Sequence, residues 1–132
     1  MIASRVSVLV VAATLSFASF ASAQSADQTL AQSLFDQGLK LANEGNFKEA
    51  CPKFAESQKL DPGGGTLINL AKCREAEGKL ASAWAAYNEA LSYSIKDGRK
   101  EREEQARARI TALAPNLATL RIMVPALSLI HI

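Results

Sequence analysis

Apolar residues recur at steps of three and four from Asp27 to Leu113, and no stretch there alternates strictly between apolar and polar positions. This period is typical of amphipathic α-helices. The same stretch is rich in Ala, Leu, Glu, Lys and Gln, which favour helix. Glycine-containing breaks at Gly45, residues 61–65, Gly78 and Gly98 divide it. The pattern therefore predicts an all-α block with helices over residues 27–43, 47–60, 66–77, 80–95 and 99–113. Thr66 and Asp97 are the expected N-caps.

The helical block repeats itself with a period of 33 residues. Positions of the same size class align in pairs: Gly45 with Gly78, Phe47 with Leu80, Ala50 with Ala83, Phe54 with Tyr87, Ser57 with Ala90 and Leu34 with Leu67. Small residues let two helices approach closely, and an aromatic side chain fills the space left between them. A repeat of this length is typical of arrays whose unit is a pair of helices.

On these residues the chain resembles the tetratricopeptide repeat family. The first copy, LFDQGLKLANEGNFKEACPKFAESQKLDP, carries the family's small, aromatic and closing positions at Gly38, Gly45, Phe47, Ala50, Phe54 and Pro62, with Ser57 where the family prefers Ala. The second copy, LINLAKCREAEGKLASAWAAYNEAL, has Ile95 in place of the closing Pro, which favours a longer second helix. The resemblance implies an antiparallel helix-turn-helix array over 27–114, with two repeats and a capping helix at 99–113.

Phrases such as EACPKFAESQKLDPGGG also resemble a group of exported bacterial repeat proteins, often from myxobacteria, in which a β-rich segment commonly follows the helices. In the repeat arrangement, the helix that carries Cys51 packs against the helix that carries Cys73. The resemblance therefore implies a disulfide between them. The alternative is two small buried core residues.

The first residues have the pattern of an export signal. Met1 to Arg5 carries one positive charge, Val6 to Phe20 is apolar, and Ala21-Ser22-Ala23 has the small-x-small form of a cleavage site. We interpret residues 1–23 as a signal peptide. An uncleaved membrane anchor is the alternative, but the apolar run is shorter than the ~20 residues of a spanning helix. The chain is therefore expected in the periplasm or cell envelope, with no membrane span after cleavage.

Two different patterns follow Pro115. Over 115–126, Leu117, Leu120, Ile122 and Val124 lie around Thr119 and Arg121, which predicts the start of a truncated β segment. The last six residues, LSLIHI, can be encoded by CTGTCTCTTATACACATC, which resembles the mosaic-end adapter of transposon-based sequencing libraries. We interpret 127–132 as a sequence artefact; a genuine apolar C-terminus is the alternative.

Composition and motifs argue against several function classes. The net charge of +2 and an aromatic content of 6% leave no basic, base-stacking surface for nucleic acid. The segment Asp61 to Thr66 is glycine-rich, but it lacks the Gly-Lys-Ser/Thr ending of a phosphate loop and no strand precedes it. No His-bearing metal cluster or activated nucleophile is recognisable. We expect no enzyme, no cofactor and no metal.

The repeat resemblance implies a protein or peptide partner, held on the face lined by the first helix of each hairpin. The positions of that face in this chain are Gln32, Phe35, Leu39, Ala42, Ile68, Asn69, Lys72 and Glu75. Phe35, Leu39 and Ile68 would form an apolar contact stripe. One alternative is that the helix at 99–113 or further chain covers this stripe internally. Others are a homodimer, and a structural spacer presenting a downstream β domain that binds an envelope polymer.

Overall fold

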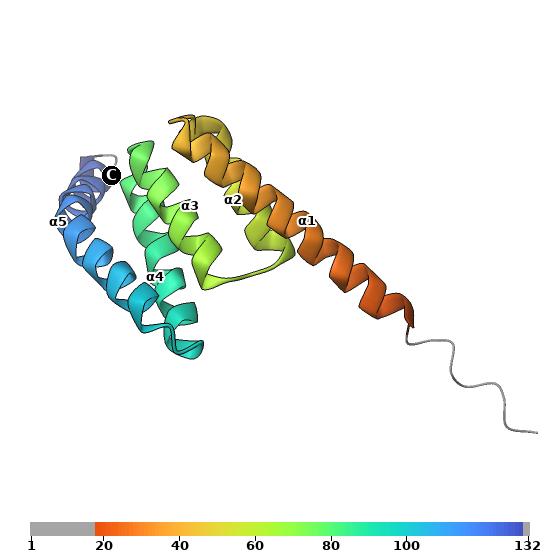
Figure 1. The fold of residues 1–132 in the computed structure, drawn as a ribbon. Coiled ribbons are helices and arrows are strands. Elements are labelled where there is room, and N and C mark those ends of the chain that lie inside the picture. The colour runs from red at the N-terminus through yellow and green to blue at the C-terminus, as the bar shows by residue number, and fades with distance from the viewer. Residues whose placement is uncertain (1–17, 131–132) are drawn as a thin grey trace, which may run out of the picture.

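The computed structural model describes the backbone of residues 18–130 and the side chains of residues 25–117. Over this range the chain is all-α, as the hydrophobic period predicts (Figure 1). In chain order the elements are α1 (Ala18–Asn43), α2 (Phe47–Leu60), α3 (Gly64–Ala76), α4 (Leu80–Lys96) and α5 (Lys100–Ile130). The predicted breaks at Gly45, Gly78 and Gly98 are confirmed as helix ends.

Three of these ends share one local design. Gly45, Gly78 and Gly98 have φ of +77°, +75° and +66°, a region that glycine enters without the steric cost of a Cβ. The residue after each glycine donates its N–H to a carbonyl five residues back, with N···O distances of 2.9, 2.9 and 2.8 Å. This is the hydrogen-bond pattern of a glycine C-cap, and it reverses the chain tightly between antiparallel helices.

The beginning of α3 differs from the prediction. Gly63 is the N-cap and the helix starts at Gly64, so Thr66 lies inside the first turn. A Cβ at position 64 would lie 3.1 Å from the Cβ of Tyr93, which shows how closely α3 approaches the end of α4. Asp97 is likewise not an N-cap, because it is the C-cap of α4. A tertiary contact, rather than local capping preference, decides where α3 starts.

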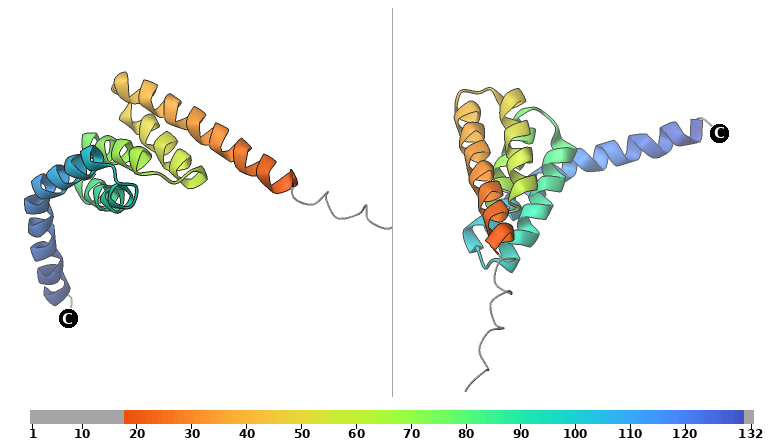
Figure 2. Two further views of the ribbon diagram at one scale, coloured as in Figure 1. Left: turned by 60° about the horizontal axis from the view of Figure 1, so that its bottom comes forward. Right: turned by 90° about the vertical axis from the view of Figure 1, so that its right-hand side faces the viewer.

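The helices form two hairpins and a covering helix (Figures 1 and 2). Helix α1 packs on α2, α3 on α4, and α5 on α4. The buried apolar residues fall into two clusters. The α3–α5 cluster is formed by Leu67, Ile68, Ala71, Ala83, Ala86, Tyr87, Ala90, Ala106 and Leu113. The hairpin-one cluster is formed by Ala50, Cys51 and Phe54 of α2 with Leu70 and Cys73 of α3.

A disulfide between Cys51 and Cys73 joins α2 to α3, with their Cα atoms 5.6 Å apart. The predicted pairing is therefore confirmed. Both sulfur-bearing residues are also buried, Cys51 being 7% and Cys73 2% exposed. The bridge closes a chain segment with a sequence separation of 22, which in the chain-entropy description stabilises the fold by about 3 kcal/mol.

The predicted strand over 115–126 is wrong for the described backbone, because α5 continues through it to Ile130. A single strand leaves its N–H and C=O groups unpaired unless a second strand lies beside it, and the described residues contain none. A helix pairs these groups within itself. The second view in Figure 2 shows the C-terminal part of α5 projecting away from the hairpins.

The predicted signal peptide covers residues 1–23, and the structure describes the chain only from residue 18 onward. Most of the predicted signal peptide therefore lies outside the described residues. Backbone at 127–130 is helical, and the interpretation of 127–132 as an artefact stays a prediction. Among the described residues, no helix combines the length and the apolar character that crossing a membrane requires.

Candidate functional site

A groove of about 270 Å³ lies between the two hairpins, at the end where the α2–α3 linker crosses from one to the other. We call it the linker groove. Residues from every described helix except α4 contribute to it, together with the linker and Asp97 just after α4. Its lining is Ala31, Gln32, Phe35, Ser57, Asp61, Pro62, Gly63, Gly64, Gly65, Thr66, Asp97 and Arg102.

The α1 side of the linker groove is apolar. The half-buried Phe35 ring packs edge-on against the buried ring of Phe54, with ring centroids 5.7 Å apart and planes at 62°. This geometry is the favourable one for two aromatic quadrupoles, so it fixes the orientation of Phe35. Beneath it, Ser57 Oγ donates a hydrogen bond of 2.8 Å to the Ala31 carbonyl. The apolar wall is therefore rigidly supported by hairpin one.

The opposite side of the linker groove is polar. The first N–H groups of a helix have no carbonyl partner within that helix. At α3 the N-cap is Gly63, which has no side chain to accept a hydrogen bond from these N–H groups. The Gly63 N–H itself donates to Gln58 Oε1 at 3.1 Å. The exposed Arg102 guanidinium lies beside Gly65, since a Cβ there would be 3.2 Å from two guanidinium atoms. Main-chain N–H groups at the start of α3 and the Arg102 guanidinium thus face the Phe35 ring, and the carboxylates of Asp61 and Asp97 line the same groove.

The predicted contact residues of α1 fall into two groups. Gln32 and Phe35 line the linker groove, and Gln32 also donates from Nε2 to Asp36 Oδ1 at 2.9 Å. Leu39 and Ala42 are half-buried and pack against the hairpin-one cluster. Only the first two are therefore placed at a hollow that another molecule could enter.

The predicted contact residues of α3 are mostly engaged within the fold. Ile68 is 4% exposed and belongs to the α3–α5 cluster. It is therefore covered within the fold, which is the alternative given above for the apolar stripe. Asn69 donates from Nδ2 to the Gly65 carbonyl at 3.0 Å, within its own helix. Lys72 is exposed. The eight positions consequently do not form one continuous surface stripe.

Glu75, the last predicted contact residue, ties three helices together. Its carboxylate accepts hydrogen bonds from the Tyr87 hydroxyl of α4 at 3.0 Å and from Arg109 Nε of α5 at 3.2 Å, and a second Arg109 nitrogen, Nη2, bonds its other oxygen. Donation to Glu75 raises the pKa of Arg109. Burial, reinforced by the Glu75 carboxylate, raises the pKa of the Tyr87 hydroxyl well above its usual value. Glu75 thus stabilises the docking of α5.

This triad gives a pH prediction. Unfolded tyrosine titrates near pH ~10, whereas folded Tyr87 keeps its proton to higher pH, so the stability from its neutral form is present below pH ~10 and lost above. Between pH ~10 and 12 the unfolding free energy of the native chain should fall more steeply than that of Tyr87→Phe, by up to about 1.4 kcal/mol per pH unit. Urea denaturation across this range measures both slopes. Equal slopes would contradict the prediction.

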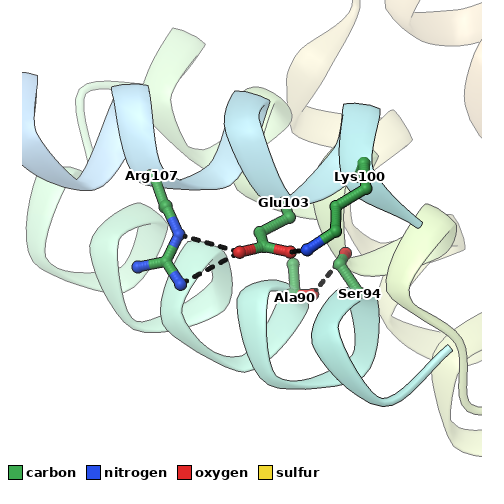
Figure 3. A network of polar contacts seen from close by, with 5 residues as sticks. All are labelled: Ala90, Ser94, Lys100, Glu103 and Arg107. Atoms are coloured by element: carbon green, nitrogen blue, oxygen red, sulfur yellow. Dashed lines mark hydrogen bonds and ion pairs between the residues drawn. The ribbon is translucent and has the colours of Figure 1, made fainter. Parts of the chain in front are cut away.

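A second polar cluster lies on the surface of α5 (Figure 3). Glu103 accepts from Arg107 Nε and Nη2 at 3.2 and 3.1 Å, and from Lys100 Nζ at 3.3 Å. These hydrogen bonds, that of Arg107 first, lower the pKa of Glu103. Glu103 and Arg107, four residues apart on α5, thus form an ion pair. Because Lys100 and Arg107 both pair with Glu103 along one exposed helix, this cluster is a solvated face rather than a binding site.

Comparison with family models, curated proteins and solved structures finds no match to this chain. The linker groove must therefore be interpreted from its own chemistry. Within the described residues, no group of three or more His, Cys, Asp or Glu side chains is placed to hold a metal ion.

The sequence analysis places Gln32 and Phe35 in the contact surface, but it does not identify the side of the linker groove formed by α3 and α5. The sequence analysis places Gly64 and Gly65 in a linker, yet they form the first turn of α3. Arg102 lies in the predicted capping helix at 99–113, and the sequence analysis does not include it among the contact residues. The signal that could have found both is the glycine run directly before a helix, since close backbone approach is a main reason for consecutive glycines there.

Proposed function

We propose that this chain is a tetratricopeptide-type scaffold, exported to the cell envelope, that holds a segment of a partner protein in the linker groove. The observation that carries the proposal is the pairing of an ordered aromatic wall at Phe35 with a donor wall at the start of α3 and Arg102. An extended segment offers both complements: an apolar side chain for the first wall and main-chain carbonyls for the second.

Three further features support this reading. The 33-residue period and the glycine-capped hairpins are those expected of stacked helix pairs. The exposed face of α1 is a polar stripe of Ser25, Gln28, Thr29, Gln32, Ser33, Asp36, Gln37 and Lys40, which suits the outer face of a terminal repeat. A disulfide persists in oxidising compartments, in keeping with export.

Site-specific photocrosslinking tests the proposal. A photoreactive phenylalanine analogue at Gln32, in the linker groove, should yield a discrete crosslinked protein in cells of the source organism. The same analogue at the exposed Glu49 of α2, outside the groove, is the matched control. Arg102→Glu should abolish the Gln32 product, because it reverses the charge of the donor wall.

The outcomes separate the candidate functions. Mass spectrometry of the Gln32 product should identify one partner protein. A product that contains peptides of this chain alone would support a homodimer instead. No product at Gln32, or identical products at Gln32 and Glu49, would refute binding in the linker groove.

A further inference from the structure

Hairpin one, formed by α1 and α2, contacts the rest of the fold mainly through the packing of α2 on α3. In the hairpin-one cluster, α3 contributes only Leu70 and Cys73, whereas the α3–α5 cluster draws no residue from α1 or α2. The four ion pairs among the described side chains all lie within residues 75–109. At the linker end the two hairpins are separated by the linker groove. The disulfide is thus the covalent side-chain link between α2 and the α3–α5 unit, beside the packing of Leu70 and Cys73 on α2.

Of the two bridged cysteines, Cys51 lines a groove on the other side of the α2–α3 contact. This hollow of about 350 Å³, the disulfide groove, is lined by Cys51 but not by Cys73, which is 2% exposed. The lining is Lys48, Cys51, Pro52, Ala55, Leu70, Arg74, Glu77, Lys79 and Ser82. A thiol that enters the groove therefore meets Cys51 first.

The charges of the disulfide groove favour an attacking thiolate. Glu77 pairs with Lys79 at 3.0 Å, so these two charges offset each other. Lys48 and Arg74 remain as positive charges, with Arg74 Nη1 also donating to the Ser82 carbonyl at 3.5 Å. Positive groups stabilise a thiolate, which is the nucleophile in thiol–disulfide exchange.

We propose that the Cys51–Cys73 bridge is a redox latch, opened at Cys51 by a dithiol protein that docks on the disulfide groove. Opening it releases α1–α2 from the α3–α5 unit, which keeps its own core. The inference does not depend on partner binding in the linker groove, because it rests on the disulfide, the two clusters and the charges around Cys51.

The exchange is balanced by the two thiols of the reductant. Its first thiolate bonds to Cys51 Sγ, the bond between Cys51 and Cys73 breaks, and Cys73 leaves with the electron pair and takes a proton. Cys73 Sγ lies 3.5 Å from the Phe47 carbonyl, so the new thiol has an acceptor for its S–H. The second thiol of the reductant then attacks the mixed disulfide, which releases Cys51 as a thiol and leaves the reductant oxidised. A dithiol is favoured because the Cys73 thiol, buried beside the mixed disulfide, re-forms the bridge unless a second thiol of the reductant resolves it.

Hydrogen exchange followed by mass spectrometry tests the release. The native disulfide protein is compared with the same chain held reduced and with Cys51→Ser/Cys73→Ser. In both open forms, exchange of the amides in α1 and α2 should accelerate about tenfold or more, while those of α3 and α4 change by less than about threefold. Equal acceleration in all helices, or no acceleration in α1 and α2, would overturn the latch.

Trapping tests the point of attack. A thioredoxin-type protein whose resolving cysteine is replaced by serine should stop at the mixed disulfide, and peptide mapping should place it on Cys51. With the intact dithiol protein, Lys48→Glu should slow reduction by about tenfold, whereas Lys53→Glu, outside the disulfide groove, should not. A mixed disulfide on Cys73, or equal rates for the two variants, would refute docking at this groove.

Discussion

Replacing Phe54 by alanine is expected to lower the free energy of unfolding by about 3–5 kcal/mol. Phe54 is 1% exposed and lies at the centre of the hairpin-one cluster. It meets the Phe35 ring of α1, and the α1 backbone comes so close that a Cβ at Gly38 would lie 2.8 Å from the Phe54 ring. Removing the ring therefore leaves a cavity between α1 and α2, which the surrounding structure fills only in part. Urea denaturation followed by circular dichroism measures the loss.

Phe35→Ala is the matched comparison, since it removes the other ring of the same pair. Phe35 is half-buried and leaves a hollow open to the linker groove, so its loss should cost about 1–2 kcal/mol. Equal losses for the two variants would show that Phe35 is a core residue and would weaken its assignment to a contact surface.

The features that the sequence predicts well are those set by local chemistry. Helix breaks at Gly45, Gly78 and Gly98 follow from the need for positive φ at a tight C-cap. The spacing of small and aromatic residues places Phe54 and Tyr87 in the interior, where both are at most 1% exposed. Ser57, which the 33-residue period aligns with Ala90, is accommodated because its hydroxyl donates to the Ala31 carbonyl.

The features that the sequence predicts poorly depend on where a distant helix passes. The start of α3 at Gly64 reflects the approach of Tyr93, thirty residues or so further along the chain. Glu75 has the composition of a surface residue, yet Arg109 and Tyr87 engage it from two other helices. The sequence analysis ends the last helix at residue 113, whereas α5 continues through Pro115 to Ile130. Pro52 inside α2 likewise shows that a proline need not end a helix, although it removes one N–H donor.

The linker groove contains residues that the sequence predicts well and one that it predicts poorly. Gln32 and Phe35 could be placed on one helix face from their spacing, because residues three apart share a face. Arg102 belongs to another helix, and its approach to Gly65 depends on how α5 crosses the end of α3. A periodic pattern shows which residues share a helix face, but the crossing of two helices is decided by the side chains at their contact.

Ile68→Ser should lower the free energy of unfolding by about 3–5 kcal/mol, because it leaves a cavity and places a polar hydroxyl in an apolar cluster. Ile68 is 4% exposed, and the α3–α5 cluster around it includes Ala106 and Leu113 of α5. Lys72→Ser, four residues further along α3 and exposed, is the control and should change stability by less than about 0.5 kcal/mol.

These two variants decide which face of α3 is internal. A large loss at Ile68 with little change at Lys72 would show that α5 covers the stripe that the repeat pattern assigns to a partner, and would confine docking to the linker groove. If Ile68→Ser instead leaves the monomer as stable as the native chain, with the crosslink from Gln32 lost, then α5 does not pack over Ile68 in solution. The contact surface would in that case extend along α3 beyond the linker groove.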